Sequence, residues 1–334
     1  MKHKAKPSFY KDLCKKDFFK DATIKVQYIN AEHYWIFKTG PNVYKFKKPI
    51  EPKSSPELEN AFCQEVVKRV AGFSPQLEPK MVCLEETEAG FVIADSVSNK
   101  SNPHFFGIAQ TQLSDRGFVN SLLSKDKFKV EHAKAVGEYL GQVHQKIDAY
   151  TGRDAGSTEF LIRLLEADFY QAKKFLGQTL KPAMTEMTLH PFQKKAKELK
   201  KLLGSRLRKG KVARVQGSFK PSKIHVGVKE VTALGRGGDP FQNAFFDVAS
   251  DVADLSVELK LLKKKDQAEA FLTQYIETTG DEDIRLVLPL YEILKVLASG
   301  LKLSLLMDQE EAPADCQTQA QAYFTLMVEL ARAL

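Results

Sequence analysis

The chain has 334 residues, of which 43% are hydrophobic and 28% charged, and its formal net charge at pH 7 is +8. This length allows two domains or lobes with a buried core, and the composition is that of a globular protein rather than a disordered one. No apolar run approaches the roughly 20 residues that span a bilayer. The lysine-rich N-terminus lacks the apolar stretch of a secretory signal, so the sequence predicts a soluble, cytoplasmic protein.

The first half of the chain carries mainly strand patterns after a basic segment at residues 1–20. Residues 22–29 alternate between apolar and polar, and residues 34–47 are two apolar runs joined by Gly-Pro-Asn, which predicts a β-hairpin. Residues 58–71 predict a helix, because four apolar side chains share one face: Leu58, Phe62, Val66 and Val70. Further strands are expected at residues 79–84 and 90–95.

Helical patterns dominate the second half. They follow a loop at residues 98–103 and continue to about residue 208, with a clear helix at 129–147. Strands are expected again only between Val212 and Leu234, and helices fill the remainder to Leu334. The polar segment at residues 308–315 predicts a flexible joint.

Positive charge gathers between Gln193 and Lys211. Apolar residues recur there at helical spacing, which predicts one amphipathic helix with a basic outer face. Such a face attracts phosphate groups or acidic partners in a salt-dependent way. No interleaved aromatic platform or known nucleic-acid module accompanies it, which argues against nucleic acid as a partner and favours a solvated face.

Two segments resemble a known family. Residues 31–49, A-E-H-Y-W-I-F-K-T-G-P-N-V-Y-K-F-K-K-P, are similar to the N-lobe signature of a bacterial branch of the aminoglycoside-phosphotransferase-like kinases. Residues 245–255, F-F-D-V-A-S-D-V-A-D-L, resemble the helix that follows the metal-binding loop in the same branch. The order of elements between them agrees as well, so the resemblance spans about residues 22 to 305.

This resemblance implies an α+β, two-lobed protein-kinase-like fold with a ligand cleft. The small, β-rich N-lobe is expected at residues 21–98. The larger, mostly helical C-lobe is expected at residues 99–334 and contains the catalytic-loop hairpin at 212–235.

In the N-lobe, the resemblance implies a nucleotide-binding ion pair. Lys45 falls where a strand lysine of the family holds the nucleotide α- and β-phosphates, and Glu65 falls where a helix glutamate pairs with that lysine. A cation on a rigid strand can meet phosphate oxygens without a large ordering cost. We therefore expect ATP or ADP as the ligand, with Lys45 and Glu65 in contact.

The catalytic loop departs from the family pattern His-Gly-Asp-x-His-x-x-Asn. The chain reads Gln216-Gly217-Ser218-Phe219-Lys220-Pro221-Ser222-Lys223 at this place. Gln216 stands for the histidine, Ser218 for the base aspartate and Lys223 for the asparagine that binds metal. Gly235 stands where a second metal ligand, an aspartate, is expected.

Phosphoryl transfer depends on a residue that positions the attacking hydroxyl and on a metal ion that neutralises the phosphates. These changes remove the residue and the ligands of the metal. A serine hydroxyl is no useful base near neutral pH, and Lys223 adds positive charge where Mg²⁺ would sit. The sequence therefore argues against Mg²⁺ binding and against catalysis. Lys220 and Lys223 are instead expected to neutralise nucleotide phosphates directly.

Four other groups complete the prediction. Asp239, in a Gly-Gly-Asp-Pro turn, is the one candidate for a remaining metal ligand, although an aspartate there commonly caps its own loop. Asp247 and Asp251 are expected to be structural, with Asp247 capping its helix. His144 and His225 lack a triad-like spacing, and we interpret them as structural histidines. The scattered cysteines are expected to be reduced thiols: Cys14, Cys63, Cys83 and Cys316.

The sequence thus predicts a pseudokinase that acts by binding a small molecule or a protein partner. Two alternatives stay open. One is an active small-molecule phosphotransferase with a site rebuilt around Asp239 and Asp247. The other is a polyanion-binding protein that uses the basic residues 193–211.

Overall fold

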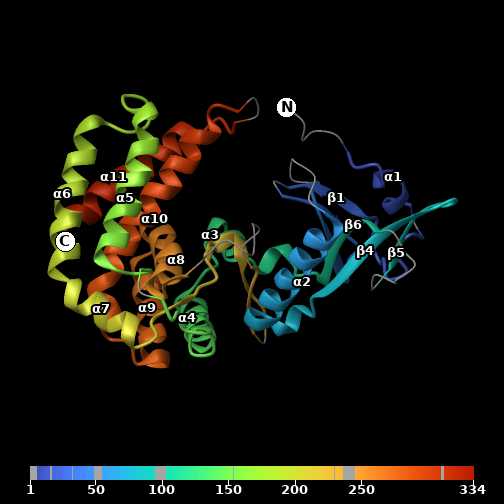
Figure 1. Ribbon diagram of the computed structural model, residues 1–334, viewed down its shortest axis with the longest axis horizontal. Coiled ribbons are helices and arrows are strands. Elements are labelled where there is room, and N and C mark those ends of the chain that lie inside the picture. Colours follow the sequence, from blue (N-terminus) through green and yellow to red (C-terminus); the bar gives the residue numbers. More distant parts are fainter. Residues whose placement is uncertain are drawn as a thin grey trace. The chain divides into compact units, whose positions relative to one another are not determined.

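The protein is described here from a computed structural model, which defines residues 6–15, 17–31, 33–48, 55–94, 103–152, 154–228, 230–235, 245–309 and 312–334. The chain forms two compact units (Figure 1). Unit 1 comprises Met1–Phe118 and Thr232–Asn243, and unit 2 comprises Val119–Val231 and Ala244–Leu334.

Unit 1 is built on a six-stranded antiparallel sheet with the strand order β1-β2-β3-β6-β4-β5. Its strands are β1 (Gln27–Asn30), β2 (Tyr34–Lys38), β3 (Asn42–Lys47), β4 (Lys80–Thr87), β5 (Gly90–Ala94) and β6 (Pro103–Thr111). The predicted hairpin is confirmed as β2 and β3, which pair antiparallel around Gly40, a residue with φ of +109° that glycine adopts readily.

The sheet is covered on both faces. On one face the N-terminal segment contributes Phe9, Leu13 and Phe19 to a cluster with Phe37 and Phe46, and it includes the short helix α1 (Tyr10–Leu13). The segment predicted only as basic is therefore part of the core, because its aromatic residues fill that face. Buried aromatic rings contribute strongly to core stability.

The other face carries α2 (Pro56–Phe73), which begins at the N-cap Ser55 and packs on β4 and β6. Phe62 and Cys63 of α2 join Phe106 and Ile108 of the sheet. Leu58, predicted on the buried face, is 61% exposed. It lies in the first turn of α2, ahead of the residues that pack on the sheet. The 3₁₀ turns η1 (Pro75–Leu77) and η2 (Asp115–Gly117) follow α2 and β6.

Strand β6 was not predicted. The expected N-lobe ended at residue 98, whereas unit 1 continues to Phe118 because β6 pairs with both β3 and β4. Phe106 and Ile108 are 3% and 2% exposed. A strand buried on both faces has no apolar–polar alternation, so its period does not distinguish it from a buried helix.

Unit 2 is mostly helical. Its helices are α3 (Val119–Ser124), α4 (Val130–His144), α5 (Thr158–Ala172), α6 (Pro182–Glu198), α7 (Lys200–Arg208), α8 (Ala249–Leu261), α9 (Lys265–Thr279), α10 (Ile284–Leu306) and α11 (Cys316–Arg332), with a 3₁₀ turn η3 (Lys173–Phe175). Helix α10 packs on α5, α8 and α11, and α4 packs along α9 (Figure 1). A Cβ on Gly137 would lie 2.4 Å from the Phe271 carbonyl oxygen, so glycine permits the close approach of α4 to α9.

The predicted catalytic-loop hairpin has a different strand pairing. β7 (Val212–Arg214) pairs with β10 (Phe245–Asp247), and β8 (Ile224–Val226) pairs with β9 (Val231–Ala233). The resemblance predicted that residues 245–255 form a helix, but the first three form β10 and α8 begins at Ala249. The start of this apolar segment completes a strand pair, and helical periodicity begins only after it.

The basic segment 193–211 is not one helix. Helix α6 ends at Glu198, and α7 runs from Lys200 to Arg208. Lys194, Lys197 and Lys201 are exposed as expected. Arg206 is the exception to the predicted basic outer face, because it is only 1% exposed.

Two further observations concern the described residues. None of their helices is long and apolar enough to cross a membrane. All four cysteines are free thiols, and Cys63, Cys83 and Cys316 are buried.

Candidate functional site

The site is the loop from Val215 to Lys223, the site loop, which follows β7 in unit 2. Val215 and Gln216 are 0% and 2% exposed, so the loop begins inside the core. Gly217 has φ of +75°, a left-handed conformation that glycine adopts at low cost, and it turns the chain toward Ser218. The 3₁₀ turn η4 (Pro221–Lys223) ends the loop.

Two aspartates of α8 hold the backbone of the site loop. The Asp251 carboxylate accepts the N–H groups of Gln216 and Gly217, each at 2.8 Å. Three residues further along α8, Asp254 accepts the N–H of Phe219 at 3.1 Å. Residues three apart lie on one face of a helix, so α8 presents both carboxylates to the loop. These three contacts hold the loop through its backbone N–H groups.

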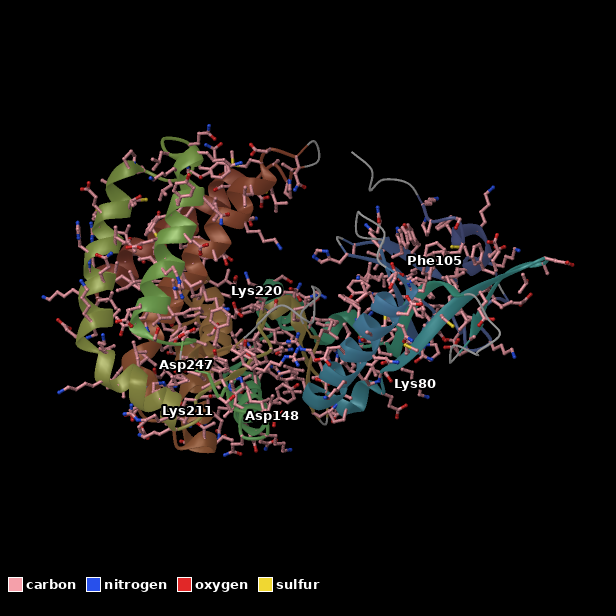
Figure 2. The ribbon with its side chains drawn as sticks, in the orientation of Figure 1. Lys80, Phe105, Asp148, Lys211, Lys220 and Asp247 are labelled. Carbon is pink, nitrogen blue, oxygen red and sulfur yellow. The ribbon has the colours of Figure 1, made fainter. Side chains whose placement is uncertain are left out.

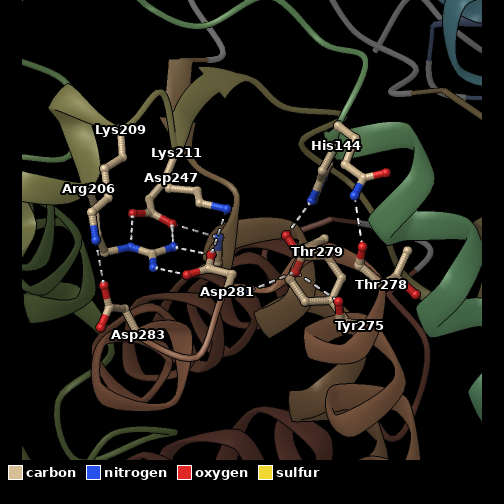
Figure 3. Close-up of polar contacts among 12 residues, drawn as sticks. His144, Arg206, Lys209, Lys211, Asp247, Tyr275, Thr278, Thr279, Asp281 and Asp283 are labelled. Carbon is tan, nitrogen blue, oxygen red and sulfur yellow. Dashed lines mark hydrogen bonds and ion pairs between the residues drawn. The ribbon is translucent and has the colours of Figure 1, made fainter.

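Asp251 has a third partner, His144 at the end of α4, whose Nε2 lies 3.3 Å from Oδ2. A carboxylate only accepts hydrogen bonds, so Nε2 carries the proton. In the neutral ring Nδ1 then accepts from the Tyr275 hydroxyl at 2.9 Å (Figure 3). His144 is therefore a buried structural histidine, and its carboxylate partner comes from 107 residues away.

The electrostatics of Asp251 favour its ionised form. Burial raises the pKa of this carboxyl group, but the His144 hydrogen bond, cationic neighbours and the Gly217 N–H outweigh burial. The net result is a pKa below the ordinary aspartate value. A stable carboxylate at the base of the loop is suited to holding backbone N–H groups.

The loop itself presents Ser218, Lys220 and Lys223, all partly exposed. The Lys220 ammonium donates to the Ser299 hydroxyl of α10 at 3.0 Å (Lys220 is labelled in Figure 2). Burial and the charge of Lys302 lower the pKa of Lys223 from its ordinary value. The two lysines of the loop therefore lie near α10 and bring positive charge to it.

A buried ion cluster, which the sequence did not predict, lies elsewhere in unit 2. Arg206 donates to both oxygens of Asp247 at 2.7 Å and to those of Asp281 at 2.6 and 3.0 Å (Figure 3). Asp247 also accepts the N–H of Ala249, the first residue of α8, at 2.9 Å, although the N-cap position itself is held by Val248. The charges raise the pKa of Arg206 although burial lowers it. Asp247 is thus bound to arginine on both of its oxygens.

In unit 1, Lys45 lies on β3 and donates to the Gln110 side-chain oxygen of β6 at 3.0 Å. Its cross-strand neighbours Ile36 and Ile108 pack in the cluster that contains α2 residues. Lys45 therefore faces the side of the sheet covered by α2, the helix that carries Glu65. Their ion pair stays a prediction, and Gln110, within the unpredicted β6, is the partner that the sequence did not suggest.

Three further predicted residues, Gly235, Asp239 and His225, lie outside the site loop. Gly235 belongs to unit 1, where a Cβ would meet Val70 at an ordinary 3.6 Å. Asp239 lies outside the described residues. His225 is buried on β8. A joint site of Lys45, Glu65 and Gly235 with the site loop stays a prediction.

Neither protein-family models nor curated protein sequences match the chain, but solved structures do. A choline/ethanolamine kinase family protein from Mesorhizobium loti aligns over 93% of this chain and 89% of its own, with 13% identity and a TM-score of 0.57. The GDP complex of aminoglycoside 2'-phosphotransferase-IIIa aligns over 93% and 95%, with 14% identity and a TM-score of 0.58. The chain has a kinase-like fold.

A third match is glucosamine kinase in complex with glucosamine, ADP and inorganic phosphate, over 93% of this chain and 81% of that one, with 12% identity and a TM-score of 0.54. The predicted α+β kinase-like fold is confirmed, with the antiparallel sheet in unit 1 and the helices in unit 2. At sequence identities this low, the similarity to these structures shows the fold alone.

The donor set of the site loop does not fit Mg²⁺. A magnesium ion takes oxygen ligands in near-octahedral geometry. Lys223 offers an ammonium, which has no lone pair while charged, and Ser218 offers one neutral hydroxyl. Within the described ranges, no group of three or more His, Cys, Asp and Glu side chains is placed to hold a metal ion.

Proposed function

We propose that the protein is a pseudokinase, which binds a ligand at its site loop without transferring a phosphoryl group. One observation carries the proposal. Asp251 and Asp254 hold the loop through its backbone N–H groups, while the loop presents Ser218 and Lys223 in place of an acidic base and an amide metal ligand. The scaffold of a kinase loop is kept and its reactive groups are replaced.

The replacements act on both requirements of phosphoryl transfer. The attacking hydroxyl has no carboxylate to accept its proton, and the charge between the β- and γ-phosphates has no metal to neutralise it. Either loss alone lowers the rate by orders of magnitude. Asp247 is no substitute ligand, because Arg206 occupies both of its oxygens.

The substrates named for the similar structures do not transfer to this chain. Those proteins are named for choline or ethanolamine, aminoglycosides and glucosamine, which are amines or, in the case of choline, a quaternary ammonium compound. Amines are cations near neutral pH, and Lys220 and Lys223 would repel them. We infer that the ligand is an anion, with ATP or ADP as the first candidate since the named complexes include ADP and GDP.

We expect no ATP turnover above background with Mg²⁺ or Mn²⁺, measured as ADP release with and without a panel of amine and sugar acceptors. The informative variant is the triple change Ser218→Asp, Lys223→Asn and Gly235→Asp, which restores the missing groups. Gly235 has room for a Cβ, so the third change fits locally. Robust turnover in the parent that is lost in Asp239→Ala would show a rebuilt active site and contradict the proposal.

Lys45 gives a second prediction. Lys45→Met is expected to weaken ATP binding about tenfold, because a hydrogen bond to a charged group is worth about 1.5–3 kcal/mol. The matched control is Lys80→Met, an exposed lysine on β4 of the same sheet (Figure 2). Equal losses in both variants, measured by calorimetry, would assign the effect to net charge and remove Lys45 from the nucleotide site.

A further inference from the structure

Several buried or partly buried cations of unit 2 are paired with carboxylates. These pairs are Arg206 with Asp247 and Asp281 at 2.7 and 2.6 Å, Lys260 with Glu292 at 2.6 Å, and Lys295 with Asp254 at 3.1 Å. Pairing offsets the cost of removing a charge from water. In these three cases a carboxylate neutralises the positive charge inside unit 2.

The two lysines of the site loop depart from this pattern. The Lys220 ammonium bonds to the neutral hydroxyl of Ser299, which does not cancel its charge. The Lys223 N–H donates to the Lys220 carbonyl at 2.8 Å, but its side-chain ammonium has no hydrogen-bond or ion-pair partner among the residues that the structure describes. An unpaired ammonium that is partly removed from water is costly. Such an arrangement persists when function requires it.

A third lysine adds to the same charge. Lys302 lies three residues after Ser299 on α10, so the two side chains share a face of that helix. Lys302 is exposed, and its charge acts on Lys223. Asp254 is the acid that lies between the loop and α10, and it is bonded to the Phe219 N–H and to Lys295 rather than to Lys220 or Lys223.

We propose that Lys220, Lys223 and Lys302, with the Ser299 hydroxyl, bind the phosphate group of a small molecule within unit 2. Each ammonium is a compact charge with three rotatable donors, suited to oxygens that point in several directions, as in phosphate. The phosphate group would supply the negative charge that neither the Lys220 nor the Lys223 ammonium receives from a described carboxylate. This phosphate site adds detail to the proposed function. It rests on that function because it assumes that Lys223 has replaced a metal ligand.

Inorganic pyrophosphate is the probe, because it carries phosphate charge without a base or sugar. The parent is expected to bind it in EDTA, and added salt is expected to weaken binding. Lys302→Gln should reduce the affinity about tenfold, as for one hydrogen bond to a charged group. The control is Lys201→Gln, an exposed lysine of α7 with the same change of net charge, which should change the affinity less than about twofold.

Lys223→Met gives a readout that a purely structural lysine would not give. Its unliganded Tm is expected to rise, because an uncompensated charge is removed from a partly buried place. The increase of Tm that pyrophosphate causes in the parent should disappear, because a ligand stabilises only the state that binds it. A lower Tm without ligand, or an undiminished response, would contradict the site.

The source of the phosphate group is distinguished by titrating ADP and adenosine alongside pyrophosphate. Binding of ADP and pyrophosphate but not adenosine, each weakened by Lys302→Gln, supports the site. The phosphate site is overturned if the parent does not bind pyrophosphate, or if Lys302→Gln and Lys201→Gln lose the same amount of pyrophosphate affinity. Neither result would bear on the predicted absence of ATP turnover. Metal-dependent ATP turnover overturns the proposed function, whereas EDTA-resistant pyrophosphate binding would still stand.

Discussion

Replacing Arg206 with methionine is expected to destabilise the protein by about 3–5 kcal/mol, because breaking a buried ion pair leaves uncompensated charge in the interior. Arg206 is 1% exposed and bonds to both Asp247 and Asp281. Lys211, at 3.7 Å from Asp281, would be the remaining cation nearby. Thermal unfolding should show the Tm fall by roughly 4–7 °C.

Arg208→Met is the matched control for this change. Arg208 is on the same helix, has the same charge and is exposed, so its replacement should alter stability by less than about 0.5 kcal/mol. Replacing Arg206, Asp247 and Asp281 together by apolar residues should recover much of the loss, since a buried ionic cluster is often no more stable than an apolar one. Equal effects of the two single changes would show that Arg206 is not a buried anchor.

The second large effect is expected at Asp251. Asp251→Asn should cost about 2–4 kcal/mol, because an amide N–H₂ replaces one carboxylate oxygen and faces an N–H group that needs an acceptor. The affected donors are Gln216, Gly217 and His144. Since these contacts fix the site loop, the variant should also lose the pyrophosphate response. Asp266→Asn, on the exposed start of α9, is the control.

The effect of Asp251 depends on pH in a defined direction. Its folded pKa is lowered from the ordinary value of 3.8, so its stabilising contribution is complete above that value. The contribution is lost as the pH falls through the lower folded pKa. The difference in unfolding free energy between parent and Asp251→Asn should therefore be constant near neutral pH and shrink below about pH 4. A difference that grows on acidification would contradict an ionised Asp251.

Local patterns were sufficient to predict much of the fold. The hairpin of β2 and β3, helix α2 and helix α4 follow from turn chemistry and apolar periodicity. Strand β6 was missed because a doubly buried strand has no alternation, and β10 was assigned to a helix because its strand partner is distant in sequence. Arg206 was assigned to an exposed basic face, since nothing near it in the sequence identifies partners 41 and 75 residues away.

The same limit applies to the site. The resemblance to the kinase family predicts that Ser218 and Lys223 replace reactive groups, because that prediction requires only the order of residues along one loop. The sequence did not indicate that the Lys220 ammonium contacts Ser299, or that the charge of Lys302 acts on Lys223. Those relations depend on α10, which packs on α8 from the far end of the chain. Tertiary packing, rather than local pattern, determines which lysines share a site.

The most direct test of the account is a calorimetric titration of ATP in EDTA and then in Mg²⁺, with parent protein and Lys223→Asn. The account predicts that the parent binds ATP equally in both buffers and more weakly in added salt, because lysines neutralise the phosphates. Lys223→Asn should gain a partial dependence on Mg²⁺, with Gly235 leaving it one ligand short. Binding of ATP by the parent only when Mg²⁺ is present would contradict the account and direct attention to Asp239.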